Sequence, residues 1–391
     1  MITKKMTIWI LAALCTLVIN SCNSGIDREK LSEALAKYDR FSDFSEGLAA
    51  VEKDGEYGFI DKTGKEVIPC IYESTFGFKK GLAMVEKDNK RGFIDKTGKV
   101  VIPFIYEDTY IFSEGLAAVR KDGKYGVIDK TGKEITPCVY VTVYTFSEGR
   151  ARVINGKCGF IDKTGKMVIP CIYDNAHNFS EGLVGVKKYG KWGFIDKTGK
   201  EVIPCKYDNV WTFSEGLAQV ELDGEWGFID KTGKVVVPCI YGWVWHFSEG
   251  LAGVQKGREW GFIDKTGKMV IPCIYDKISD FSEGLAWIRK EVKWGVIDKT
   301  GKEVIPCIYD YDNVSSFSKG FARVYNDDFF SNKQGLIDKT GKVVIPCIYD
   351  NISDFSEGLA WVANYDEDGK IGFIDKEGYF IGKGIVERIV P

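Results

Sequence analysis

The segment FSEGLAQVELDGEWGFIDKTGKVVVPCIY, residues 213–241, decides the fold because close copies of it recur along most of the 391-residue chain. Its most regular part, Asp-Lys-Thr-Gly, occurs nine times, and a tenth copy at residues 375–378 reads Asp-Lys-Glu-Gly. The copies are spaced by 34 residues, once by 33, until two final steps of 40 and 37. Such a period predicts one tandem repeat array rather than the two or three separate domains that chain length alone suggests.

Each repeat predicts three β-strands joined by tight turns. In the quoted copy the strands are expected at residues 217–221, 226–230 and 235–241. Asp223-Gly224 favours a two-residue hairpin turn, because both residue types tolerate positive φ. Pro238 has no N–H group to donate, so we expect the third strand to lie at a sheet edge or to bend there.

The number of strands per repeat guides the choice of architecture. A three-stranded unit cannot bury both faces alone, so neighbouring units must stack. Propeller blades usually have four strands, and rings usually hold about four to eight blades. Ten three-stranded β-hairpin units of about 34 residues, spanning residues 41–378, therefore predict an all-β open superhelix or solenoid-like stack. A closed toroid or β-propeller-like ring is the alternative, and residues 379–391 are expected to form a C-terminal cap.

The N-terminus has the pattern of an export signal. Two lysines, Lys4 and Lys5, precede an apolar run at residues 7–19, which is too short to span a bilayer. The run ends in Ile-Asn-Ser-Cys22, which resembles a bacterial lipobox. We therefore expect a lipoprotein signal peptide at residues 1–21 and a lipid on Cys22. The alternative is an ordinary secretory signal with an incidental cysteine.

A lipid on Cys22 implies an exported protein anchored to the bacterial cell envelope, on the periplasmic or surface face of the outer membrane. Residues 22–40 are then expected to act as a polar tether. Leu31, Leu35 and Tyr38 have helical spacing and predict a short helix within it.

Composition and motifs exclude several classes of function. The formal net charge of −3 argues against a nucleic-acid partner, which requires excess Lys and Arg. Only two histidines occur, and there is no Cys-x-x-Cys spacing, which leaves little room for imidazole catalysis or zinc. The sequence contains no Gly-rich phosphate-binding loop, so it gives no indication of a nucleotide ligand. We expect no enzymatic activity, cofactor or metal.

Three recurrent motifs resemble chemistry but are better explained by structure. Asp-Lys-Thr-Gly also occurs in the phosphorylated loop of P-type ATPases, yet nine copies at hairpin turns fit a turn motif. A glutamate before glycine recurs in the Phe-Ser-Glu-Gly turn, so a hydrolase with paired carboxylates is the least supported function. The recurrent cysteines are Cys70, Cys138, Cys171, Cys205, Cys239, Cys273, Cys307 and Cys347.

Those cysteines share a slot that Phe104 fills in the second unit, so the slot is apolar and free buried thiols are expected. Disulfides between units are the alternative. Eight free thiols are unusual in an exported protein, because disulfides form readily outside the cytosol. The expected export therefore counts against the interpretation of these cysteines as free thiols.

Positions that vary between repeats are the better candidates for ligand binding. Two residues before each repeating Phe stand Ser42, Phe76, Tyr110, Tyr144, His177, Trp211, Trp245, Ser279, Ser315 and Ser353. Six consecutive units thus carry a ring, and Trp243 and His246 add two more in the seventh. Stacking the units would align these residues, here called the aromatic ladder, for binding sugar rings or an extended peptide. The alternative is that the rings only pack unit against unit.

A second variable position is x in the first-strand pattern Leu-Ala-x-Val. Strand alternation places x opposite the repeating Ala and Val, so we expect it on the less buried face. Its larger occupants are Met84, Arg152, Gln219, Trp287, Arg323 and Trp361.

The repeats resemble the WG (KWG) repeat family of bacterial proteins. The resemblance rests on Lys-Trp-Gly at residues 191–193 and 293–295, on Glu-Trp-Gly at 225–227 and 259–261, and on the flanking Phe-Ser-Glu-Gly-Leu-Ala and Asp-Lys-Thr-Gly-Lys strings. It covers residues 41–380, although other residues replace the Trp in six units. The resemblance implies exported or envelope-associated repeat proteins without established enzymatic activity.

Together these features predict a non-enzymatic, envelope-anchored repeat protein that presents an elongated binding surface. A cell-wall or surface glycan held by the aromatic ladder is the expected ligand. A protein–protein interaction scaffold of the envelope, using the second variable position, is the alternative.

Overall fold

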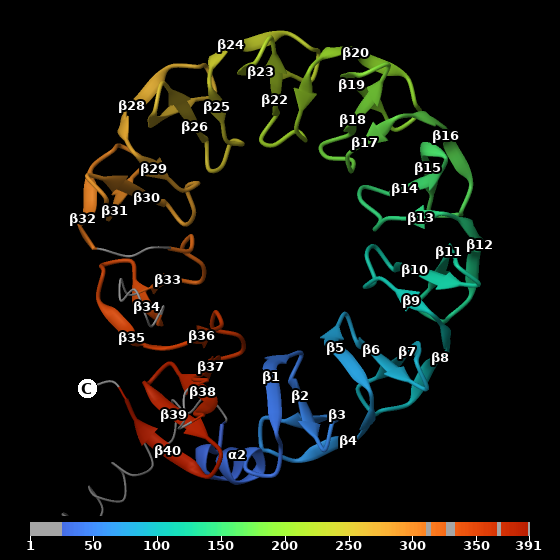
Figure 1. The fold of residues 1–391 in the computed structure, drawn as a ribbon, viewed down its shortest axis with the longest axis vertical. Coiled ribbons are helices and arrows are strands. Elements are labelled where there is room, and N and C mark those ends of the chain that lie inside the picture. The colour runs from blue at the N-terminus through green and yellow to red at the C-terminus, as the bar shows by residue number, and fades with distance from the viewer. Residues whose placement is uncertain (1–25, 310–313, 326–332, 366–368, 390–391) are drawn as a thin grey trace, which may run out of the picture.

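The computed structural model of the chain describes residues 26–309, 314–325, 333–365 and 369–389. Within these residues the chain forms one helix, α2 (Arg28–Leu35), and ten antiparallel sheets arranged as the blades of a closed ring (Figure 1). The expected signal peptide and Cys22 lie outside the described residues.

Blades are numbered 1 to 10 along the chain, and their strands follow one another from the centre of the ring outward (Figure 1). The innermost strands are β1 (Arg40–Ser45), β5 (Ser74–Lys79), β9 (Asp108–Thr109), β13 (Thr142–Val143), β17 (Asn175–Ala176), β21 (Asn209–Val210), β25 (Trp243–Val244), β29 (Lys277–Ile278) and β36 (Asn351–Ile352). The second strands are β2 (Leu48–Lys53), β6 (Leu82–Lys87), β10 (Leu116–Lys121), β14 (Arg150–Asn155), β18 (Leu183–Lys188), β22 (Leu217–Leu222), β26 (Leu251–Lys256), β30 (Leu285–Lys290), β33 (Phe321–Tyr325) and β37 (Leu359–Ala363).

The third strands are β3 (Glu56–Asp61), β7 (Lys90–Asp95), β11 (Lys124–Asp129), β15 (Lys157–Asp162), β19 (Lys191–Asp196), β23 (Glu225–Asp230), β27 (Glu259–Asp264), β31 (Lys293–Asp298), β34 (Gln334–Asp338) and β38 (Ile371–Asp375). The outer strands are β4 (Glu66–Tyr72), β8 (Val100–Tyr106), β12 (Glu134–Tyr140), β16 (Met167–Tyr173), β20 (Glu201–Tyr207), β24 (Val235–Tyr241), β28 (Met269–Tyr275), β32 (Glu303–Tyr309), β35 (Val343–Tyr349), β39 (Tyr379–Gly382) and β40 (Ile385–Arg388). The segment expected as a cap thus supplies the last two strands of blade 10.

The prediction of an open superhelix of three-stranded units is wrong. The molecule is a ten-bladed β-propeller built mainly from four-stranded sheets. Sequence patterning misses the innermost strand because, in most blades, it has only two residues, as in β21, where Asn209 and Val210 pair with Glu221 and Val220. Two residues are too few to show the alternation that identifies a strand.

Blades are joined by the Phe-Ser-Glu-Gly turn. Ser214 Oγ donates to the Phe247 carbonyl of the next blade at 2.9 Å. Glu215 accepts from the Gly250 N–H at 2.9 Å and pairs with Lys265 Nζ at 3.0 Å. In the eight blades whose turn carries Glu, the turn therefore holds the blade against the following one, whereas blades 2 and 9 have Lys80 and Lys319 in that slot.

Blades 10 and 1 meet through the same contacts. Ser356 Oγ donates to the Phe44 carbonyl at 2.9 Å, and Glu357 accepts from the Gly47 N–H at 3.0 Å and pairs with Lys62 at 2.8 Å. Because this last interface repeats the internal ones, the ring is closed, which is the second reason why the open stack is wrong.

The recurrent glutamate is a turn residue, as predicted, and it also carries the interblade ion pair. Its φ of 51 to 54° is uncommon for a residue with a side chain. Contacts of its carboxylate with the next blade offset that strain. Among the described residues the pairs are Glu46–Lys96, Glu114–Lys163, Glu148–Lys197, Glu181–Lys231, Glu215–Lys265, Glu249–Lys299, Glu283–Lys339 and Glu357–Lys62.

These ion pairs predict an acid-sensitive ring. The partner lysine holds the pKa of Glu114, Glu249 and Glu283 below the ordinary value of 4.5. A lowered folded-state pKa contributes stability that is complete above the unfolded-state pKa and is lost as pH falls through the folded one. Changing all three residues to Gln should cost about 1.5–3 kcal/mol at neutral pH, since each partly exposed pair contributes about 0.5–1 kcal/mol.

Thermal melts between about pH 5 and pH 3 test this expectation, because the triple variant should lose less stability than the parent over that range. An equal loss of stability in the two proteins would contradict the assignment.

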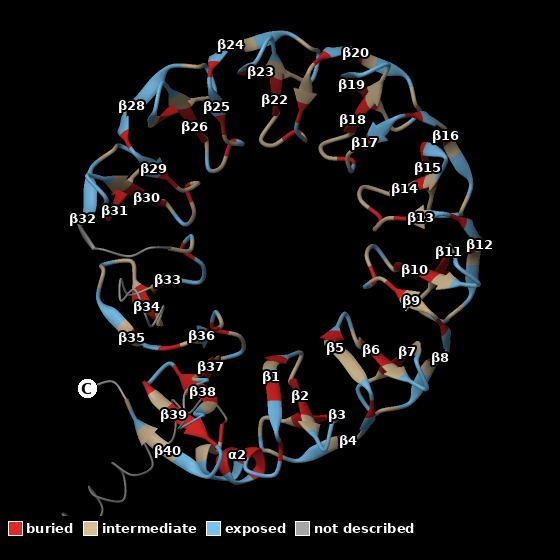
Figure 2. Ribbon diagram, in the orientation of Figure 1, coloured by how far each residue is buried: buried red, intermediate tan, exposed pale blue. Residues whose placement is uncertain are grey.

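The glycine of the Trp-Gly pair allows the outer strand to pass close to the third strand. A Cβ on Gly227 would stand 2.4 Å from the Val237 carbonyl oxygen and 2.7 Å from backbone atoms of Pro238. The register of β23 and β24 shifts at this point. Pro238 lies in an outer strand, as predicted, and Figure 2 shows such strands largely exposed.

The repeated cysteines lie in the outer strands and are free thiols, which confirms that part of the prediction. They are half-buried rather than sealed, and Cys239 Sγ lies 3.6 Å from the Val220 carbonyl oxygen. Burial raises the pKa of all eight thiols. Because the thiolate is the reactive form, a raised pKa slows their oxidation.

Helix α2 closes the seam between the first and last blades from the outside (Figure 1). Leu31 and Leu35 are fully buried in a core shared with Phe41 of blade 1 and Phe373 of blade 10. Ser32 binds blade 10 twice, through Oγ to the Gly382 carbonyl at 2.8 Å and through its own carbonyl to the Gly384 N–H at 3.0 Å. The predicted short helix is confirmed, and it packs on the ring.

Candidate functional site

The rings of the aromatic ladder lie within or just after the innermost strands of blades 2 to 7. The Trp211 N–H donates to the Gln219 carbonyl at 3.0 Å, and the His177 N–H donates to the Gly185 carbonyl at 2.9 Å. These bonds fix the backbone of each ladder residue to the second strand of its blade. The ladder therefore lies along the inner edge of the ring (Figure 1).

Ladder side chains are in contact with solvent. Phe76, Trp211 and Trp243 are 71%, 47% and 41% exposed. Tyr110, Tyr144, His177 and Trp245 are half-buried, and His246 is exposed. None of these eight side chains is sealed in the core, so all remain candidates for ligand contact.

Several ladder rings also pack on the residue that fills the Trp slot of the same blade. Tyr110 stacks on Tyr125 with centroids 5.7 Å apart, and His177 stacks on Trp192 at 4.5 Å. Trp245 packs edge-on against Trp260 at 5.8 Å. Each of these three rings thus packs on a neighbour and is half-buried rather than sealed, so both interpretations of the ladder stay open.

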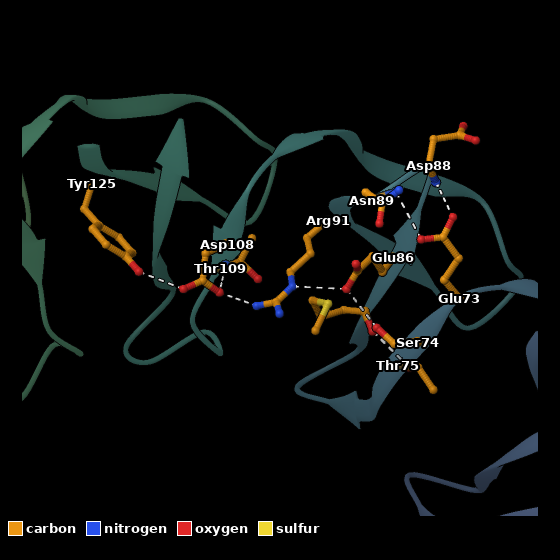
Figure 3. A network of polar contacts seen from close by, with 11 residues as sticks. Glu73, Ser74, Thr75, Glu86, Asp88, Asn89, Arg91, Asp108, Thr109 and Tyr125 are labelled. Atoms are coloured by element: carbon orange, nitrogen blue, oxygen red, sulfur yellow. Dashed lines mark hydrogen bonds and ion pairs between the residues drawn. The ribbon is translucent and has the colours of Figure 1, made fainter. Parts of the chain in front are cut away.

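Figure 3 shows how polar side chains connect blades 2 and 3. The Tyr125 hydroxyl donates to Asp108 at 2.7 Å, and Asp108 also pairs with Arg91. Arg91 stands in the Trp slot of blade 2 and also pairs with Glu86 at 3.4 Å. Burial and the Asp108 carboxylate raise the pKa of Tyr125, which therefore stays a protonated donor.

Most of the ladder rings lie around two separate cavities rather than one continuous groove, and Phe76 also borders a third cavity, of about 690 Å³, together with Ser42. The apolar pocket, of about 350 Å³, is lined by Phe76, Met84, Thr109, Tyr110, Ile111, Tyr144 and Thr145. The Trp pocket, of about 540 Å³, is lined by Ser180, Trp211, Thr212, Phe213, Ser214, Gln219, Trp243, Val244, Trp245, His246 and Asp280. His177 stacks on Trp211 at 6.1 Å and so belongs to the Trp side.

The second variable position does not form an exposed face, and this prediction is wrong. Trp287, Met84 and Gln219 are 0%, 4% and 7% exposed. Arg152, Arg323 and Trp361 are half-buried. The reason is that both faces of a propeller blade pack against neighbouring blades, so strand alternation does not separate a buried face from a free one.

Instead, this position makes contacts between blades. Gln219 Nε2 donates to the Val244 carbonyl at 3.1 Å, and Trp287 Nε1 donates to the Ser315 carbonyl at 2.9 Å. The Arg152 guanidinium donates to the Ala176 carbonyl and lies over the Tyr144 ring at 3.8 Å. Met84 and Gln219 nevertheless reach the walls of the two pockets.

The two variable positions share one space between blades. A Cβ on Gly185 would come within 3.0 Å of the His177 ring, so the small residue makes room for the large one. Where the ladder residue is Ser279, its hydroxyl accepts from the backbone N–H of Trp287 at 2.9 Å, and the large ring stands at x. Comparing the two positions repeat by repeat shows one small and one large residue in six of the ten repeats, and the exceptions are Ser42 with Ala50, Phe76 with Met84, Tyr144 with Arg152, and Trp211 with Gln219.

Asp280 is the site residue that sequence reasoning missed. It occupies the slot directly before the repeating Phe and lines the Trp pocket. Burial raises the pKa of its carboxyl group, and His246, with Nε2 at 3.5 Å, opposes that rise. The varied composition of this slot, which holds His246 in blade 7 and Thr212 in blade 6, was the available signal.

The part of the chain that the structure describes contains neither a metal-binding cluster nor a membrane-spanning helix. No group of three or more His, Cys, Asp or Glu side chains there is placed to hold a metal ion. No helix among these residues has the length and apolar character needed to cross a membrane.

Comparisons with solved structures give distant likenesses. A eukaryotic initiation factor is 12% identical, with 77% of this chain and 95% of that chain covered and a TM-score of 0.48. The extracellular domain of a putative hybrid two-component system from B. thetaiotaomicron is 11% identical, with coverages of 87% and 58% and a TM-score of 0.27. The dihydro-heme d1 dehydrogenase NirN is 14% identical, with coverages of 86% and 72% and a TM-score of 0.36.

Comparison with curated protein sequences gives no match. The model of the WG containing repeat, in contrast, matches ten times in succession. The matched residues are 35–57, 57–90, 92–125, 125–157, 159–192, 192–226, 226–258, 260–294, 294–328 and 335–367. Because these matches span most of the repeat array, the chain belongs to the WG repeat family.

Proposed function

We propose that this propeller is a non-enzymatic binding protein, exported and anchored to the bacterial envelope through a lipid on Cys22, whose aromatic ladder binds a cell-wall or surface glycan. The observation that carries the proposal is that three tryptophan side chains line the same cavity, the Trp pocket. Trp211, Trp243 and Trp245 come from two neighbouring blades and line one cavity of about 540 Å³. That volume lies within the usual range for small-molecule sites.

The chemistry of this pocket suits a sugar. Aromatic faces supply a flat apolar surface that loses little conformational entropy on binding, and they can stack on the C–H faces of a pyranose ring. Asp280, His246 and Gln219 add polar atoms that can pair with hydroxyl groups and fix the orientation of the sugar.

Replacing Trp211 and Trp245 together with alanine tests the proposal. We expect retention on the bound members of a glycan array to fall about 100-fold, since interface aromatics often contribute about 1–2 kcal/mol each and 1.4 kcal/mol is tenfold in affinity. Tyr189→Ala is the matched control, because Tyr189 is 88% exposed and lines neither pocket. Unchanged retention of the double variant would refute glycan binding by the ladder.

One observation favours a protein partner as the second candidate. Phe76 is 71% exposed at the margin of the apolar pocket, where a partner's apolar side chain could cover it. Crosslinking in cells followed by mass spectrometry should then recover one dominant envelope protein, and Phe76→Ser should reduce its yield. Recovery of many unrelated proteins, unaffected by that change, would count against a scaffold.

A further inference from the structure

We infer that the Trp pocket selects ligands that carry a positively charged ammonium group. This inference rests on the proposed function of the same pocket and narrows its ligand class. An amino sugar and a quaternary ammonium head group share this chemistry. Three features carry the inference. The indole rings that line the pocket are held by other rings behind them, the Asp280 carboxylate has no close cationic partner among the described residues, and the described lining of the pocket offers hydrogen-bond acceptors but no Lys or Arg.

The indole walls are held in place from behind. Trp226 packs against Trp243 with centroids 5.0 Å apart, and Trp260 packs against Trp245 at 5.8 Å. His177 stacks on Trp211 at 6.1 Å with an interplanar angle of 12°. Rings supported in this way keep their orientation without ligand, so little ordering is needed on binding. The face of an indole is also the aromatic surface that attracts cations most strongly.

Asp280 provides a carboxylate beside those walls, and its partner is weak. The side chain is 27% exposed and its described partner is His246, whose Nε2 lies 3.5 Å away. That separation is longer than a normal charged hydrogen bond. A partly buried carboxylate without a close cation is costly, and an ammonium ligand would supply one.

Equivalent aspartates in other blades show the contrast. Asp43 occupies the same slot in blade 1, where it accepts from Ser353 Oγ at 2.7 Å and the Trp361 N–H at 3.2 Å. Asp354 occupies it in blade 10 and pairs with Arg323 at 3.3 Å. Of these three aspartates, Asp280 alone lines the Trp pocket.

The remaining lining also favours a donor-rich cation over an anion. No Lys or Arg is among the described residues that line the Trp pocket. Gln219 uses its amide nitrogen on the Val244 carbonyl, which leaves its carbonyl oxygen as an acceptor. A ligand with a carboxylate or sulfate would therefore face Asp280 without a compensating cation.

Calorimetric titration of the purified full-length protein tests the inference with matched probes. The probes are a glucosamine oligomer at a pH where its amines are protonated, the N-acetylated oligomer of the same length, and choline. We expect the amino oligomer to bind at least tenfold more tightly than the N-acetylated one. Asp280→Asn should remove that preference by weakening the amino oligomer at least tenfold, and it should weaken the N-acetylated oligomer less, because only the amino oligomer loses a charged partner. Asp354→Asn, the same change in the equivalent slot outside the pocket, should alter neither affinity.

The outcomes separate this inference from the proposed function. Equal binding of both oligomers, unaffected by Asp280→Asn, overturns ammonium selection and leaves glycan binding intact. Binding of choline alone, lost in Asp280→Asn, supports ammonium selection and assigns its source to a head group rather than a sugar. Absence of binding by all three probes overturns both proposals.

Discussion

Replacing Gly227 with alanine is expected to lower the free energy of unfolding by about 3 kcal/mol, which is the upper end for overpacking a well-ordered interior. The added methyl group would lie 2.4 Å from the Val237 carbonyl oxygen and 2.7 Å from backbone atoms of Pro238. Because these are backbone atoms, no change of side-chain rotamer can relieve the clash. Blade 6 would then have to separate its third and outer strands. Chemical denaturation followed by tryptophan fluorescence measures the loss.

Gly242→Ala is the matched control for this prediction. A Cβ at Gly242 meets only the Gln255 side chain, at 3.9 Å, and Gly242 does not need positive φ. We expect this variant to keep the parent's stability or to gain slightly, because alanine restricts the unfolded chain. If both variants lose the same free energy, close strand approach is not the role of the Trp-Gly glycine.

Replacing Leu31 with aspartate is expected to open the ring at its seam. Leu31 lies on α2 and is fully buried against blades 1 and 10. An aspartate there would bury an unpaired charge, which should lower the free energy of unfolding by about 3 kcal/mol or more. Amide hydrogens of β1 and β37, the strands that meet across the seam, should then exchange about 100-fold faster, since 1.4 kcal/mol is tenfold.

Glu33→Asp serves as the control because it places the same carboxylate on the exposed side of α2. Hydrogen exchange in β1 and β37 should not change in this variant. Faster exchange spread evenly over all ten blades in Leu31→Asp would show that the helix stabilises the whole array rather than the seam.

The repeat period, three of the four strands, both turn motifs and the edge position of Pro238 could all be predicted from local sequence, because hairpins are specified by residues close together in the chain. Ring closure could not be predicted in this way, because it depends on whether the angles between ten successive blades add up to bring blade 10 against blade 1. No single repeat encodes that sum. The two-residue innermost strand was missed for a related reason: β21 is defined by its pairing partner rather than by its own pattern.

The candidate site was predictable in its aromatic half and missed in its acidic half. Rings at one slot in six consecutive repeats stand out in any comparison of the copies. Asp280 does not, because aspartate is common beside turns and the slot varies without an evident rule. The burial of Gln219 and Trp287 was misjudged because alternation marks a free face only when one side of a sheet is uncovered.

The seam also bears on how such a protein can change over time. Because the contact of Glu357 with blade 1 repeats that of the internal glutamates, the specialised features at the ends of the array are α2 and the two outer strands of blade 10. Losing one repeat would raise the mean rotation per blade only from about 36° to about 40°, spread over all joints. Gene-level duplication or deletion could therefore resize the circle while a binding pocket shared by three or four adjacent copies travels intact.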